Sequence, residues 1–176
     1  PRPSVSIALP LSVGVQSCCE LLDFELDGQR FSCEEIRDRL NACLVQGVRV
    51  LSVYEDGGKT GNIAYLRCRI VMEYDSGVPE GCCEAVKNLF GRTSLLVNKK
   101  NKNGFQQQDV IPMIRRIEVV EQGSEVVLNA RVCCQNPSLN PMQLHAAVVH
   151  YLPQYAPDFA KCTRLELYDD KETIFR

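Results

Sequence analysis

The sequence predicts an α+β fold made of two ferredoxin-like βαββαβ units, with antiparallel sheets and the helices on one face. Three observations lead to this prediction. Several segments alternate apolar and polar residues with the period of a half-buried strand, as residues 20–27 do. Ser32-Cys-Glu-Glu35 is a capping box, and Asn140-Pro141 is a second helix-start signal. The expected elements run β-β-α-β to residue 58 and, from residue 62, β-α-β, β-β, α-β.

The first unit, residues 1–58, is predicted to lack its opening strand and helix. Its expected elements are strands at 5–15, 20–27 and 48–53 and a helix from residue 32 to about 44. Pro10 removes a ladder donor from the first strand and therefore predicts an edge, a bulge or a break there. Asp27-Gly28 is typical of a turn.

The second unit, residues 62–176, contains all six elements of the βαββαβ order once one extra hairpin strand is removed. Its expected strands lie at 63–74, 93–97, 116–120, 126–133 and 163–168, and its helices at 78–90 and 140–152. Residues 98–104 are predicted to be a loop, and the tail from Asp169 is expected to be loose. We expect both units to share one compact domain.

Charge is distributed unevenly along a chain whose net charge is only −2. Residues 20–35 carry six acids and one base, and residues 92–116 carry six bases and one acid. Such asymmetry is typical of a nucleic-acid face, and equally of a solvated strand and loop. The sequence contains no run of 18 apolar residues, so we predict no membrane span and a cytoplasmic protein.

The ten cysteines are predicted to be reduced thiols. Three groups are adjacent pairs, Cys18-Cys19, Cys82-Cys83 and Cys133-Cys134, whose side chains point apart on a strand. A zinc site needs two cysteines that are two to four residues apart, and the sequence has no such pair. We therefore predict no metal and no cofactor.

The opening residues 1–17, PRPSVSIALPLSVGVQS, resemble the signature NPRPKISFALPLPLGVES of the radical-SAM-linked proteins, an uncharacterised bacterial family. Three later stretches resemble that family in the same order. They are the acidic strand at 19–26, the basic block at 98–114, and the helix and arginine-bearing strand at 136–168.

The chain also departs from the family pattern. Asn140-Pro141-Met142 replaces the usual Arg-Pro-Asp, and the family's opening segment, with its SHLD box and Arg-rich helix, is absent from this sequence. The resemblance therefore implies an N-terminally truncated member. It also implies a domain that lies next to, or is fused to, a cobalamin-binding radical SAM protein, and whose gene lies near RNase E/G.

A nucleic-acid surface is predicted around the basic block, because Lys and Arg can contact phosphates while neighbouring amides reach base edges. Phe105 is expected to stack on a base. The resemblance adds Arg164, since the family carries an arginine there; an ion pair with Glu166 or Asp169 is the alternative. The candidate residues are Lys99, Lys100, Lys102, Phe105, Arg115, Arg116 and Arg164.

Three functions remain open. The first is a non-catalytic module that binds RNA and acts with a radical SAM partner in tRNA or rRNA modification. The second is an RNA-modifying enzyme in its own right, with Asp109 as a weak catalytic candidate; the alternative role for Asp109 is to cap the following turn. The third is a protein-interaction domain without nucleic acid.

Overall fold

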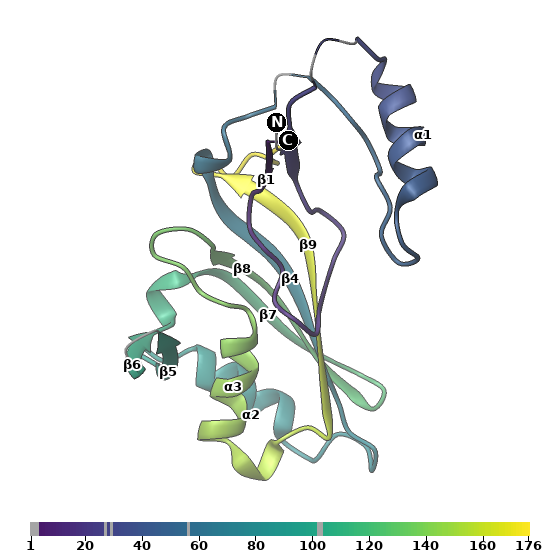
Figure 1. Cartoon of the computed structure of the whole chain (residues 1–176). Coiled ribbons are helices and arrows are strands. Elements are labelled where there is room, and N and C mark those ends of the chain that lie inside the picture. Colours follow the sequence, from purple (N-terminus) through teal and green to yellow (C-terminus); the bar gives the residue numbers. More distant parts are fainter. Residues whose placement is uncertain (1–3, 27, 29, 56, 102–103) are drawn as a thin grey trace.

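The computed structural model describes residues 4–26, 28, 30–55, 57–101 and 104–176. It confirms a mixed α+β fold with three α-helices (Figure 1). The helices are α1 Cys33–Cys43, α2 Cys82–Phe90 and α3 Met142–Tyr151. The strands are β1 Val5–Ile7, β2 Val15–Ser17, β3 Leu22–Phe24, β4 Ile63–Glu73, β5 Leu96–Asn101, β6 Gly104–Asp109, β7 Ile114–Gln122, β8 Glu125–Cys133 and β9 Phe159–Asp169. Short 3-10 turns occupy Thr60–Asn62, Ile111–Met113 and Pro153–Tyr155.

A five-stranded sheet with the order β2-β9-β4-β8-β7 forms the centre of the molecule. The neighbours β9-β4, β4-β8 and β8-β7 are antiparallel, and β2 joins β9 in parallel. From β4 to β9 the elements follow the order β-α-β-β-α-β, with the β5–β6 hairpin inserted after α2. The strands expected at 63–74, 116–120, 126–133 and 163–168 are confirmed, and β9 begins four residues earlier than expected.

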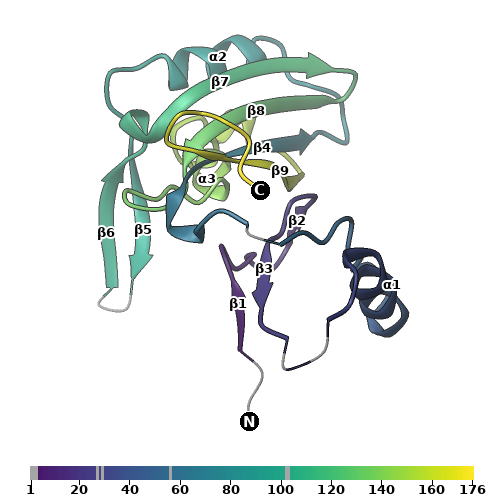
Figure 2. The ribbon, with the colours of Figure 1, turned by 90° about the horizontal axis from the view of Figure 1, so that it is seen from above.

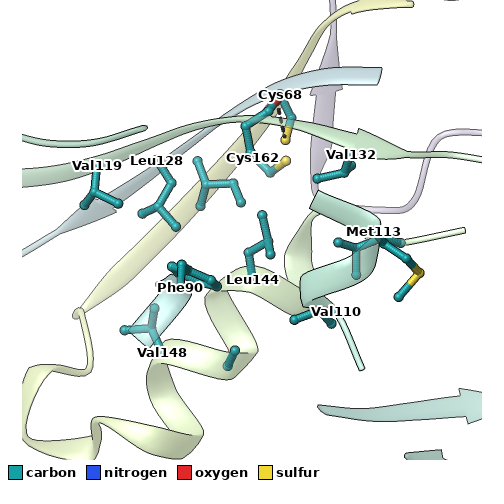
Figure 3. Close-up of a cluster of buried hydrophobic side chains, with 14 of the residues drawn as sticks. Cys68, Phe90, Val110, Met113, Val119, Leu128, Val132, Leu144, Val148 and Cys162 are labelled. Carbon is teal, nitrogen blue, oxygen red and sulfur yellow. Dashed lines mark hydrogen bonds between the residues drawn. The ribbon is translucent and has the colours of Figure 1, made fainter. Parts of the chain in front are cut away.

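Helices α2 and α3 cover one face of this sheet (Figures 1 and 3). Alternation along β4 buries Leu66, Cys68 and Ile70 on that face and leaves the intervening side chains on the other. The helices contribute apolar stripes that include Phe90, Leu144 and Val148. Figure 3 shows these stripes meeting Leu128 and Val119 of the sheet. No helix of the described residues covers the opposite face, which is called the open face below.

Residues 4–55 depart most from the predicted first unit. The expected strand at 5–15 is broken at Pro10 into β1, which pairs with β3 in a separate two-stranded sheet, and β2, which joins the main sheet. Residues 48–53 are not a strand, so the prediction there is wrong. Helix α1 and its capping box are confirmed, but α1 buries none of its residues. A duplicated ferredoxin-like arrangement is therefore not confirmed, and the unit boundary at 58–62 stays a prediction.

Two further predictions in the second half are wrong. Residues 98–104 were expected to be a loop, but 98–101 and 104 lie in strands β5 and β6 of a hairpin that extends away from the main sheet (Figure 2); 102 and 103 lie outside the described residues. The tail is held in place, because Ile174 bridges to Tyr168 and Phe175 is 7% exposed. None of the helices in the described ranges is long and apolar enough to cross a bilayer.

Candidate functional site

The open face carries a row of arginines. Arg131 of β8 lies directly opposite both Arg67 of β4 and Arg116 of β7. Residues directly opposite one another in an antiparallel sheet point to the same face, with Cβ atoms about 5 Å apart. Like charges in such positions destabilise a sheet, so the row conflicts with local stability. Conflicts of this kind concentrate at functional sites.

Two more arginines extend the row. Arg69 lies two residues after Arg67 on the same face of β4, and its Nη2 donates to Gln122 Oε1 at 3.2 Å. Arg115 lies at the irregular start of β7, with its guanidinium 4.9 Å from the centre of the Tyr65 ring. We define the arginine face as Arg67, Arg69, Arg115, Arg116 and Arg131.

A tyrosine ring and one carboxylate contact Arg131 and Arg115 of the arginine face. The Arg131 guanidinium lies 4.0 Å from the centre of the Tyr168 ring, a cation–π distance. Glu172 accepts from Arg131 Nη1 at 2.5 Å and lies 3.9 Å from Arg115 Nε. Glu172 also has a left-handed backbone with φ of 61°. This single carboxylate offsets only part of the charge of the two arginines that it contacts.

The charges of the other three arginines are not offset by ion pairs with described carboxylates. Among the described residues, no carboxylate lies within ion-pair distance of Arg67, Arg69 or Arg116. Glu166, opposite Arg67, instead binds Arg176 at 2.6 and 3.0 Å. That hydrogen bonding holds the pKa of Glu166 below its usual range. The arginine face is therefore a cationic surface with unpaired guanidinium groups.

The predicted hairpin surface is only partly described. Lys99 lies on β5, and its Nζ donates to Ser138 O at 3.3 Å, with Ser138 Oγ at 3.5 Å. These neutral acceptors leave the ammonium charge in place. Lys102 lies outside the described residues, as do the side chains of Lys100 and Phe105, whose backbones pair with each other.

The structure brings Arg115 and Arg116 together on the arginine face and places Arg164 elsewhere. Arg164 lies opposite Cys68, on the helix-covered side of the sheet, and is 9% exposed. Its Nη1 donates to Glu20 Oε1 and to Leu9 O, both at 2.8 Å. Its ion-pair partner is therefore Glu20, not either of the acids considered from the sequence.

Asp109 has backbone partners on both sides of the hairpin. Its Oδ1 accepts from Leu95 N at 2.9 Å and from Ile111 N at 3.1 Å. The hydrogen bond from Leu95 is the main reason why the pKa of Asp109 lies below its usual range. This geometry fixes the hairpin to the turn that follows it, which is the capping role considered from the sequence.

A pocket of about 200 Å³ lies on the helix-covered side of the main sheet, next to the N-terminal end of α3. The N-terminal segment 9–12 and Val15 form one wall, and Cys134 with residues 138–141 form the other. Leu66, Cys162 and Arg164 of the main sheet form the remaining surface. The pocket is mostly apolar with one guanidinium, a combination that suits a small ligand.

The thiols and histidines offer no metal site. Within the described ranges, no three His, Cys, Asp or Glu side chains are placed to hold a metal ion. All ten cysteines are free thiols, and Cys68 and Cys162 lie next to each other in the core (Figure 3). Burial lowers the pKa of His145 below its usual range.

Thiol alkylation is expected to separate the exposed from the buried cysteines. Cys18 and Cys43 are exposed, whereas burial raises the pKa of Cys134 from 9.0 to about 12. At equal pH, Cys134 then holds about a thousandfold less thiolate than an unperturbed thiol. Iodoacetamide followed by mass spectrometry should label Cys18 and Cys43 first, and denaturing urea should equalise the rates. Rapid native labelling of Cys134 would contradict this burial.

Arg67, Arg69 and Arg131 were not identified as site residues from the sequence. The alternation of β4 could have placed Arg67 and Arg69 opposite the buried Cys68. Their alignment with Arg131 depends on the register between strands that are about 60 residues apart in the sequence. No local signal carries that register.

A family model described as an uncharacterized protein conserved in bacteria (DUF2344) matches residues 1–141. The matched range includes the arginine face, the hairpin and both walls of the pocket, and it ends where α3 begins. No curated protein and no solved structure matches the chain.

Proposed function

Since the chain belongs to the DUF2344 family of bacterial proteins, we propose that it is a non-catalytic RNA-binding module that acts with a radical SAM partner. The observation that carries the RNA part is the row formed by Arg67, Arg131 and Arg116 on a sheet face without helices. Unpaired arginines bind phosphates strongly, because the guanidinium fork matches the geometry of phosphate oxygens.

The neighbouring tyrosines support RNA as the polyanion. Single-stranded RNA is bound where unstacked bases can stack on aromatic rings or guanidinium planes. Tyr65 and Tyr168 lie directly opposite each other on β4 and β9, and each stacks with an arginine of the arginine face. Tyr168 is only 6% exposed, so an RNA base on this surface would stack on the half-buried Tyr65 or on a guanidinium plane. The hairpin segment, whose sequence carries Lys99, Lys100 and Lys102 and no acid between residues 96 and 108, would add a second basic surface.

A double substitution tests the arginine face. Arg67→Gln/Arg116→Gln removes two exposed cations without breaking an ion pair, so the fold should be retained. We expect the affinity for a labelled single-stranded RNA to fall about tenfold or more, and the slope of log affinity against log salt to decrease by about 2. Fluorescence anisotropy across a salt series measures both.

The matched control is Arg37→Gln/Arg39→Gln, which removes the same charge from α1. Arg37 pairs with Asp38, and Arg39 lies over the Phe31 ring, so neither contacts the main sheet through these interactions. Unchanged affinity and salt slope in the arginine-face variant would exclude this surface. An equal loss of RNA affinity in both variants would show that net charge, and not this surface, determines binding. Lys99→Ala/Lys100→Ala/Lys102→Ala tests the hairpin in the same assay.

Protein interaction is the second candidate, and the N-terminal third favours it. Of the fourteen exposed large hydrophobic residues in the described ranges, ten lie between Val5 and Tyr54. Contiguous exposed apolar surface marks protein interaction sites. We propose that this region docks the radical SAM partner while the arginine face holds RNA. An enzymatic role through Asp109 has less support, because backbone donors already occupy its Oδ1.

A further inference from the structure

We propose that the pocket between residues 9–12 and residues 138–141 binds the guanine base of a nucleotide. The inference goes beyond the proposed RNA-binding face, because this pocket lies on the opposite side of the main sheet. Arg164, the charged group of the pocket, provides the recognition chemistry.

Arg164 presents an unused edge. Its Nη1 makes both of its described hydrogen bonds, to Leu9 O and to Glu20 Oε1. Nε and Nη2 have no partner among the described residues, and neither is a buried atom sealed from solvent. These two atoms form a planar fork of parallel N–H donors. Arg164 is 9% exposed and lines the pocket, so we place these two aligned donors at the pocket surface.

The charge of the site favours a neutral acceptor over a phosphate. Glu20 already neutralises the guanidinium at 2.8 Å. An anion placed on the free edge would meet a nearly neutral pair and a nearby carboxylate, so it would gain little Coulomb energy. A base edge with two adjacent acceptors needs only the N–H dipoles. Guanine presents O6 and N7 in that arrangement, whereas adenine presents one acceptor and one donor.

The size and walls of the pocket fit a single planar ring system. A dry apolar cavity of about 150 Å³ is enough to hold benzene, and this pocket has about 200 Å³ and is open to solvent. Leu9, Pro10 and Leu11 on one side and Leu139 with Pro141 on the other provide apolar surfaces for the two faces of a base. Ser12 lies at the exposed rim.

The ammonium group of Lys99 lies next to the pocket and could bind the phosphate of a nucleotide whose base occupies the pocket. Lys99 contacts Ser138, which is part of the pocket wall. Gln108 Nε2 also donates to Ser138 O at 3.0 Å, so the hairpin and the pocket wall are joined. The base is either an unstacked residue of an RNA strand bound along the hairpin or part of a free nucleotide. Both sources share the same chemistry at Arg164.

Two pairs of probes separate these sources. Free GMP is compared with AMP by NMR titration, and an oligouridine with one central guanine is compared with the same strand carrying one central adenine by anisotropy. We expect the wild-type protein to prefer guanine about tenfold, the effect of one bidentate base contact.

Three variants locate the preference. Ser12→Tyr fills the mouth of the pocket, and Val13→Tyr places the same ring on the neighbouring residue, which is fully exposed and does not line the pocket. Arg164→Lys keeps the charge opposite Glu20 but removes the fork. Guanine preference should be lost in Ser12→Tyr and Arg164→Lys and retained in Val13→Tyr.

Each outcome decides between the proposals. A wild-type protein that does not distinguish guanine from adenine in either pair of probes overturns the inference, as does a preference that survives Ser12→Tyr. GMP preference without any RNA binding supports the pocket and overturns the proposed RNA function. RNA binding that is indifferent to the central base, with GMP and AMP also bound alike, leaves the arginine face and removes the pocket.

Discussion

Replacing Leu144 by Ala should lower the free energy of unfolding by about 3 kcal/mol, within the range for buried Leu→Ala changes. Leu144 is fully buried at the centre of the contact between α3 and the main sheet, close to Leu128 and Cys162 (Figure 3). The substitution removes three carbon atoms from a packed interior that can collapse only partly, so a cavity term adds to the lost transfer free energy. Urea denaturation followed by circular dichroism measures the difference.

Val149→Ala is the matched control on the same helix. Val149 is 38% exposed, so the change should cost less than about 1 kcal/mol. The two variants share helix propensity effects of similar small size, and burial is the main difference between them. Equal losses in both would contradict the docking of α3 through Leu144 and would place the core elsewhere.

The second half of the fold could be predicted from sequence because its signals are local. The alternation of β4 and the apolar stripe of α2 each lie within one element, and 63–74 and 78–90 were placed to within a few residues. The valines of 48–53 gave an equally local signal, but these residues form no strand, and Val50 N and O bind the Asn41 side chain. Local pattern indicates which strands can form, and pairing decides which do.

The hairpin shows the opposite error. Residues 98–104 are polar and rich in Asn and Lys, a composition that is typical of loops. The β5–β6 ladder forms because Asp109 fixes one end to Leu95 and the Tyr151 hydroxyl donates to Leu96 O. Both contacts depend on tertiary structure, so composition alone could not reveal them.

Some residues of the candidate site could be predicted from local sequence, and others only from strand pairing. Arg115 and Arg116 were predicted as part of a basic segment, and their partners Arg67 and Arg131 emerge only from strand register. Arg164 was predicted as a nucleic-acid contact from the family resemblance, with an ion pair as the alternative, and the structure shows an ion pair with Glu20. Nη1 of Arg164 holds the N-terminal segment through Leu9 and Glu20, and the residue also lines the pocket.

Replacing Arg164 by Met should lower the free energy of unfolding by about 2 kcal/mol, because it leaves Glu20 and the Leu9 carbonyl without their shared donor. Arg37→Met is the control, since Arg37 pairs with Asp38 while both side chains are exposed (39% and 67%), and it should cost below about 1 kcal/mol. Thermal or urea unfolding of both variants gives the comparison. Adding Glu20→Leu to Arg164→Met should restore part of the loss by removing the unpaired carboxylate. If Arg164→Met costs no more than Arg37→Met, the hydrogen bonds from Arg164 to Leu9 O and Glu20 contribute little to stability.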